Sequence, residues 1–240
     1  MSYTSLLNSL DSLRKEAPKA FSAYHPKKDN IEKLNQARSK SYVHLFLKAR
    51  FGVINFIERH NYICDGSQDG GVDAYYIDKD ERCIYLIQSK FRTTEKNFEE
   101  KSIDASELLR MEISRISKGE QTDSNGIPFS SKILSFQQVI SGIRDIAFYR
   151  WKVVILANLK RINDEQVRRL IDNLEYEVFD YERTYQELVF PLVTGTYYKP
   201  DSIEIKINLG KKTHPQLNQD VETMIGTCNV RMIYVPYQKS

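Results

Sequence analysis

The chain has 240 residues, of which 41% are hydrophobic and 28% are charged, and its formal net charge is +3. A chain of this size and composition can build a hydrophobic core in one large domain or two small ones, which excludes an intrinsically disordered protein. The net charge is too small to indicate nucleic-acid binding by itself. The chain has no apolar run long enough for a membrane span and no secretory-signal pattern at its start, so we expect no membrane partner.

Two amphipathic helices are predicted near the N-terminus. Four leucines recur at helical spacing in residues 3–16, and a second helical pattern runs over residues 31–49. Gly52 interrupts this second helix, and residues 53–60 add a further turn or two. We assign residues 1–38 to an N-terminal helical arm and residues 39–240 to one domain.

The N-terminal quarter of the chain is its most basic part. Residues 1–60 contain 11 Lys and Arg against 5 Asp and Glu. A basic lobe would suit a polyanion bound beside a carboxylate site. On charge alone, a solvated helical surface explains the excess more simply.

The pattern changes after residue 64. A loop rich in Gly and Asp (65–71) precedes two strand-like runs, VDAYYID (72–78) and CIYLIQSKF (83–91). Further helices are predicted at residues 98–118, 131–147 and 162–174, and further strands at residues 151–159, 176–180, 202–209 and 229–237. This order predicts an α/β (α+β) domain, in which helices flank a mixed sheet.

The three cysteines are Cys64, Cys83 and Cys228. They are few, odd in number and widely spaced, which argues against a zinc ribbon or a disulfide framework. We therefore expect the reducing environment of the cytoplasm.

The two strands around residue 80 bring three polar side chains together. A four-residue connection, KDER (79–82), would pair Asp78 with Cys83 and so place Asp73 opposite Gln88. Opposed residues lie about 4.5–5.5 Å apart at Cβ. Lys90 lies two residues further along on the same face of the strand. A slip of one residue in register would scatter the three.

These groups have the chemistry of phosphodiester hydrolysis. Magnesium prefers oxygen ligands and takes one or two protein carboxylates together with water and phosphate. Asp73 would supply a carboxylate and Gln88 an amide oxygen, and the backbone carbonyl of Ser89 a third ligand. Lys90 would orient the attacking water and stabilise charge on the phosphate. A lysine that is buried behind an apolar run needs a partner, and Asp73 is the expected one.

The glycine pair and one arginine are candidate contacts to nucleic acid. Gly70 and Gly71 would let the backbone approach DNA without a Cβ clash. Arg92 could contact a phosphate or stand at a solvated strand end. Asp65 and Asp69 are read as turn formers rather than metal ligands.

At these residues the sequence resembles a known family. GGVDA (70–74) followed by QSK (88–90) is similar to the GG(V/I)D…(E/Q)xK core of the PD-(D/E)xK restriction-endonuclease-like nucleases, and in particular to Mrr-like enzymes. The longer string DGSQDGGVDAYYIDKD…IYLIQSKFR resembles the N-terminal region of abortive-infection phage-resistance (AIPR-type) proteins. The looser similarity covers roughly residues 40–210.

The resemblance implies a restriction-endonuclease-like fold and the roles given above to Asp73, Gln88 and Lys90. It also implies DNA, or less readily RNA, as substrate and Mg²⁺ as cofactor, with Mn²⁺ as a substitute. AIPR-type proteins are longer than this chain, which implies either a truncated version that lacks a downstream domain or a minimal version. The wider family often acts as homodimers, although no dimer signal stands out in the sequence. The family often has an acid in the helix before the hairpin, where SYVHLFLKAR (41–50) has none and Glu58 is the nearest candidate.

Two functions therefore stay open. The first is a metal-dependent endonuclease in restriction or anti-phage defence. The second is a catalytically inactive module of the same fold that binds nucleic acid or a protein partner. A small-molecule enzyme has little support, because the sequence has no GxGxxG, P-loop or GxSxG motif.

Overall fold

The structure, a computed structural model, describes residues 2–27, 29–64, 66–103, 107–108, 110–159 and 162–197. These residues belong to one compact unit that ends at Tyr197. The strands predicted at residues 202–209 and 229–237 lie outside the described residues, as does Cys228.

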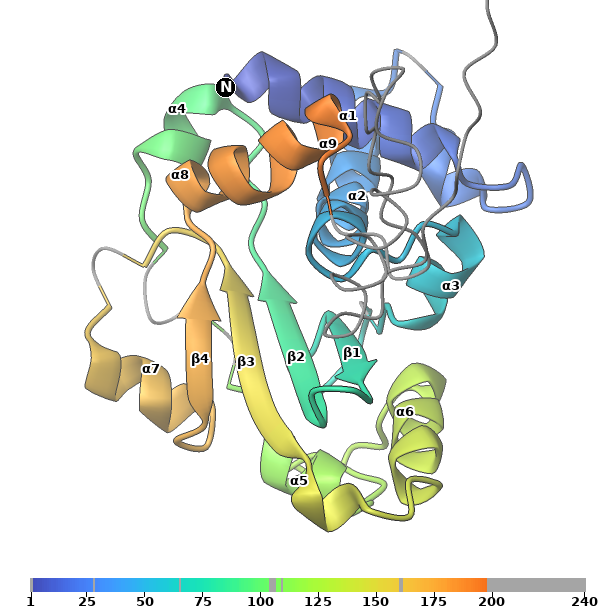
Figure 1. The fold of residues 1–240 in the computed structure, drawn as a ribbon, viewed down its shortest axis with the longest axis vertical. Coiled ribbons are helices and arrows are strands. Elements are labelled where there is room, and N and C mark those ends of the chain that lie inside the picture. The colour runs from blue at the N-terminus through green and yellow to red at the C-terminus, as the bar shows by residue number, and fades with distance from the viewer. Residues whose placement is uncertain are drawn as a thin grey trace, which may run out of the picture. The chain divides into compact units, whose positions relative to one another are not determined.

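A four-stranded mixed sheet forms the centre of this unit (Figure 1). Its strands are β1 (Ala74–Asp78), β2 (Cys83–Ser89), β3 (Arg150–Leu156) and β4 (Glu175–Val178), and they lie in that order. β1 pairs antiparallel with β2, whereas β2, β3 and β4 run parallel. With helices on both faces of the sheet, the predicted α/β class is confirmed.

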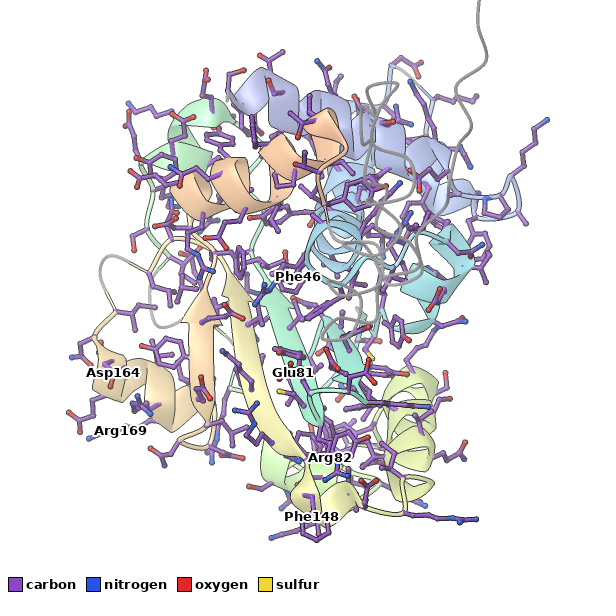
Figure 2. The ribbon with its side chains drawn as sticks, viewed as in Figure 1. Phe46, Glu81, Arg82, Phe148, Asp164 and Arg169 are labelled. Carbon is purple, nitrogen blue, oxygen red and sulfur yellow. The ribbon has the colours of Figure 1, made fainter. Side chains whose placement is uncertain are left out.

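The N-terminal helices cover one face of the sheet. α1 (Tyr3–Lys15) and α2 (Ile31–Phe51) share a buried cluster with side chains from β1, β2 and β3. The η1 turn (Ser22–Tyr24) connects these helices, and α3 (Phe56–Asn61) follows after Gly52 ends α2 at φ 67°. Phe46 of α2 is fully buried in this layer (Figure 2).

The predicted boundary between residues 38 and 39 therefore needs correction. It falls inside α2, which runs unbroken across it. The leucines of α1 are buried in the same core as the sheet. The first two helices are thus part of the central unit and do not form a separate arm.

The opposite face of the sheet is covered by α5 (Ile113–Ser117), α6 (Ser131–Ser141) and α7 (Asp164–Leu170). Asn163 caps α7, in a capping box with Gln166. β3 is apolar on both faces because it packs against both helical layers, and Val153 through Leu156 are fully buried.

Two predicted helices are wrong in extent. Residues 98–118 do not form one helix: α4 (Glu95–Glu99) overlaps their first two residues, and α5 is the one further helix among the residues described there. Between these helices the Ile103 amide donates to Asn158 O at 2.9 Å and the Met111 amide to Leu170 O at 2.9 Å, so tertiary hydrogen bonds replace helical ones. The helix predicted at 131–147 ends at Ser141, and a separate turn, η2 (Ile146–Phe148), follows.

A helical segment after β4 was not predicted. It consists of α8 (Tyr181–Arg183), the π-helical η3 (Thr184–Val189) and α9 (Phe190–Thr194). Leu188 and Val189 are buried in the cluster of α1 and α2. Among the helices that the structure describes, none has the length and apolar character to cross a membrane.

A buried polar cluster ties α2 to α3. Nδ1 of His44 accepts from Nε of Arg59 at 3.2 Å, and Nε2 of His44 lies 2.9 Å from the Tyr24 hydroxyl. Arg59 also pairs with Glu16 and donates to the Val53 carbonyl at 2.9 Å. Burial, together with the Arg59 guanidinium, lowers the pKa of His44 to about 2. His44 is therefore a neutral ring at physiological pH.

Candidate functional site

The hairpin of β1 and β2 has the predicted register. Asp78 pairs with Cys83, and the ladder continues to Ala74 opposite Ile87. The Asp73 amide also donates to Ile87 O, at 2.9 Å, although Ile87 is the partner of Ala74, so the regular ladder ends at Ala74. Asp73 and Gln88 both lie at this end of the hairpin, and their direct opposition remains a prediction.

Alternation along the two strands assigns their side chains to the two faces of the sheet. Tyr75 of β1 and Leu86 of β2 are buried in the core beneath α5, α6 and α7, whereas Ala74 and Ile87 face α1 and α2. Gln88 pairs with Ile155, which belongs to the same core, so Gln88 continues this face of β2. Val72 and Tyr75 lie in one cluster, so the alternation of β1 does not continue through Asp73.

The Asp73 carboxylate is half-buried and held against β2. Its Oδ2 accepts from the Ser89 amide at 2.6 Å. The Asp73 carbonyl accepts from the Cys64 amide at 2.8 Å, so the segment before β1 fixes the residue from the other side. These contacts leave the carboxylate a fixed position next to the Ser89 peptide.

Gln88 is 1% exposed, and its amide group is oriented by the loop. Its Nε2 donates to the Gly71 carbonyl at 2.8 Å. A buried amide that donates to a backbone carbonyl has one defined orientation, because the reverse would bring two acceptors together. The nitrogen therefore faces the glycine pair.

Lys90 differs from its predicted environment. It is half-buried and follows the end of β2, where its amide donates to Leu156 O at 3.1 Å. Within the described residues its ammonium forms no ion pair, so the expected pair with Asp73 is wrong. Lys90 instead lines a small open pocket past the end of the strand. A position at the strand end keeps the ammonium near solvent, so it needs no buried partner.

The glycine pair is needed by the chain's own packing. Gly71 has φ 77°, and a Cβ on it would lie 2.7 Å from the Arg110 carbonyl oxygen. Gly70 has φ 64°, and its Cβ would lie 3.0 Å from side-chain atoms of Ile116 and Phe129. Their predicted contact with DNA remains a prediction, but both residues already meet residues 110–129 of the same chain.

Asp69 acts as the predicted turn former. Its Oδ1 accepts from the Gly71 amide at 2.9 Å and its Oδ2 from the Gly66 amide at 3.3 Å. Asp65 lies outside the described residues. The Asp69 carboxylate therefore stabilises the loop before β1 through hydrogen bonds to the backbone of that loop.

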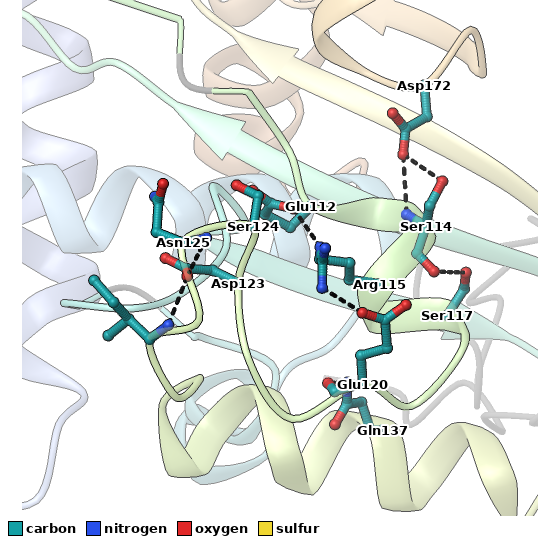
Figure 3. A network of polar contacts seen from close by, with 11 residues as sticks. Glu112, Ser114, Arg115, Ser117, Glu120, Asp123, Ser124, Asn125, Gln137 and Asp172 are labelled. Atoms are coloured by element: carbon teal, nitrogen blue, oxygen red, sulfur yellow. Dashed lines mark hydrogen bonds and ion pairs between the residues drawn. The ribbon is translucent and has the colours of Figure 1, made fainter.

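A polar network supports the segment against which this loop packs (Figure 3). Ser124 Oγ donates to the Glu112 carboxylate at 2.6 Å, and Arg115 pairs with Glu120. Gln137 of α6 donates to the Glu120 carbonyl at 2.7 Å. Because the Glu112 amide donates to Gly70 O at 2.9 Å, this network is continuous with the glycine pair.

Arg92 is already engaged within the protein. Its guanidinium pairs with Glu107, and its carbonyl accepts from the Tyr3 hydroxyl at 2.9 Å. Its Nε is buried and has no hydrogen-bond partner among the described residues. Arg92 therefore lies beside the strand end with one donor unused.

The oxygen atoms at the hairpin end are of the type that a hard divalent cation such as Mg²⁺ prefers as ligands. They are the carboxylate of Asp73, the amide oxygen of Gln88 and the backbone carbonyl of Ser89. Mg²⁺ is commonly held by few protein oxygens and completes its shell with water and phosphate. In the described part of the chain no three His, Cys, Asp or Glu side chains group together to hold a metal, and Glu58 lies exposed on α3. The site offers one carboxylate.

The thiols of Cys64 and Cys83 do not add a nucleophile. Cys64 and Cys83 are buried and free. Burial raises the pKa of Cys64 to about 12, so it stays a thiol.

Sequence reasoning missed the pocket that Lys90 lines. Its other polar residues include Lys101, Asn158 and Asp180. In the sequence, Asn158 and Asp180 could be recognised as polar residues that closely follow a strand. That they line the same pocket becomes clear only from the order of the strands in the sheet.

Comparison of the chain with family models, with curated proteins and with solved structures finds no match.

Proposed function

We propose that the chain is a metal-dependent endonuclease that hydrolyses DNA phosphodiester bonds in restriction or anti-phage defence. The observation that carries the proposal is the contact at the end of the hairpin, where the Asp73 carboxylate accepts from the Ser89 amide, between Gln88 and Lys90 in the sequence, at 2.6 Å. The resemblance of GGVDA and QSK to the PD-(D/E)xK core supports the same positions.

Each residue of the candidate site has its own proposed role. Asp73, Gln88 and the Ser89 carbonyl would hold Mg²⁺, or Mn²⁺ in its place. A divalent cation bound there would polarise the scissile phosphate and lower the pKa of a bound water. Lys90 holds a phosphate oxygen by charge and orients the attacking water, as a compact cation at the strand end. The hydrogen bond from Ser89 to Asp73 fixes the carboxylate before substrate arrives.

Plasmid cleavage with Mg²⁺ or Mn²⁺ tests the proposal. Asp73→Asn keeps an acceptor for the Ser89 amide but removes the charge, and Lys90→Ala removes the cation. Each variant should lose cleavage by at least about a hundred-fold, as for other lost electrostatic groups. Asp80→Asn and Lys79→Ala are matched controls in the exposed turn at the other end of the hairpin, and they should cut like wild type. Full cleavage by both site variants would refute the assignment.

A second function is favoured by two observations. The site offers one carboxylate, and the Gln88 amide donates to Gly71 in the same place. A module of this kind would bind DNA or a protein partner without cutting DNA. Titration with Mn²⁺ by calorimetry separates the two functions: heat of binding that is lost in Asp73→Asn supports the nuclease, and no heat with wild type supports the binding module.

A further inference from the structure

The pocket beside Lys90 lies where three parallel strands end. Lys90 and Arg92 follow β2, Asn158 follows β3, and Asp180 follows β4. In Figure 1 the arrowheads of these strands point in one direction, toward α4 and α8. Ligands of open α/β sheets bind at the carboxyl ends of such strands.

One buried residue, Asn158, connects the segments that line this pocket. Asn158 is 5% exposed, and its Nδ2 donates to Phe98 O at 2.7 Å while its Oδ1 accepts from the Tyr181 amide at 3.0 Å. The Asn158 carbonyl accepts from the Ile103 amide at 2.9 Å. One residue therefore joins the end of α4, the segment that carries Lys101 and the start of α8. The pocket is shaped before a ligand arrives.

The charges of the pocket favour an anion. Three cations line it, namely Lys90, Arg92 and Lys101, and one carboxylate, Asp180. Because Glu107 already pairs with Arg92, the two lysines supply the uncompensated charge. Asp180 is occupied as the cap of α8, where it accepts from the Arg183 amide at 3.0 Å. In the parts of the chain that are described, neither lysine has an ion-pair partner. The buried Nε of Arg92 has no acceptor there. Buried donors that lack partners are uncommon and are often explained by a ligand or ion.

We propose that this pocket binds a backbone phosphate of the DNA strand, with Lys101 and Arg92 as its ligands. The inference rests on the proposed function, because Lys90 belongs to both the pocket and the candidate catalytic site. A phosphate seated there would place the neighbouring phosphate of the strand toward Lys90 and the end of the hairpin. The pocket would then set the position of the strand before hydrolysis.

Binding without metal tests this site separately from catalysis. The affinity of the protein for a fluorescent DNA duplex is measured by anisotropy in EDTA over a series of salt concentrations. Lys101→Gln is the test variant, because Lys101 is exposed and its loss leaves the core intact. Its binding should be weaker, and the slope of log affinity against log salt should fall by about 0.9, the value for one lost phosphate contact. Lys101→Arg should restore both, and Lys79→Gln, in the distant turn, should change neither.

The outcomes separate the two proposals. If Lys101→Gln binds with the affinity and salt slope of Lys79→Gln, or if wild type does not bind the duplex, the phosphate site is refuted. If the Lys101 effect is found but wild type never cuts DNA, the site stands and the proposed hydrolysis fails.

Discussion

Gly71, in the loop before β1, offers a sharp test of how the end of the hairpin is built. Gly71→Ala should destabilise the fold for two reasons that can be separated. At φ 77° an alanine adopts a left-handed conformation, which costs about 1–2 kcal/mol. Its Cβ would also lie 2.7 Å from the Arg110 carbonyl oxygen and 3.2 Å from the carbonyl carbon. Forced contacts of this kind cost about 1–3 kcal/mol, so the total is about 2–5 kcal/mol.

Gly126→Ala is the matched control for this variant. Gly126 has φ 78°, and a Cβ there would meet nothing within 4 Å. It bears only the conformational cost, and the effect on the unfolded chain is the same for both variants. Urea denaturation of the two variants and wild type measures the free energy of unfolding. It should be about 1–3 kcal/mol lower for Gly71→Ala than for Gly126→Ala, at an unchanged m-value.

The same variant should also reduce cleavage, because the Gly71 carbonyl holds the Gln88 amide. A shift of this carbonyl moves one of the groups proposed to bind the metal. Equal unfolding midpoints for Gly71→Ala and Gly126→Ala would show that the loop does not pack tightly against Arg110, and the reasoning would fail.

Three further predictions concern the core, the site and a helix end. His44 is neutral in the fold because its pKa lies far below the ordinary 6.5, so the unfolded chain binds a proton that the folded chain does not. Stability should be full above about pH 6.5 and fall below it by up to about 1.4 kcal/mol per pH unit. His44→Gln should flatten this slope in urea denaturation at pH 7.5 and 5.5, and an unchanged slope would contradict the burial of a neutral ring beside Arg59. Gln88→Glu removes the donor to Gly71 O and should cost about 1–3 kcal/mol in EDTA. Saturating Mg²⁺ should recover part of that loss in thermal unfolding, whereas equal loss with and without Mg²⁺ would argue against a metal at Gln88. Asn163→Ala should lower the free energy of unfolding by about 1 kcal/mol, since it removes the cap of α7, and no change would show that the capping box contributes nothing.

Local patterns were enough to predict the centre of the fold. The short connection between β1 and β2 and the alternation of their side chains fix one register, because a slip would expose Leu86 and bury charged groups. The apolar run of β3 and the cap at Asn163 were likewise readable, since each depends on neighbours in the sequence.

Features that depend on distant parts of the chain were not predicted. Residues 98–118 have a helical apolar pattern, yet Ile103 and Met111 bond to the backbone of residues 158 and 170 instead of to their own neighbours. Tertiary hydrogen bonds outweigh helix propensity here, since each propensity term is only a few tenths of a kcal/mol.

The site shows the same division. The register from Asp78 opposite Cys83 to Ala74 opposite Ile87 followed from the turn, but the surroundings of Lys90 did not. Its pocket is assembled from residues that follow three strands, and Lys101 reaches it through the contact of its segment with Asn158. The conformation of Gly71 could be expected from its type, whereas its contact with Arg110 required the fold.

A crystal soaked in Mn²⁺ would test the central claim most directly. The account predicts an anomalous density peak in contact with the Asp73 carboxylate and the Gln88 amide oxygen, and no such peak in crystals of Asp73→Asn. Manganese bound only elsewhere on the protein, with the hairpin end empty at saturating concentration, would contradict a metal-dependent nuclease centred on these strands.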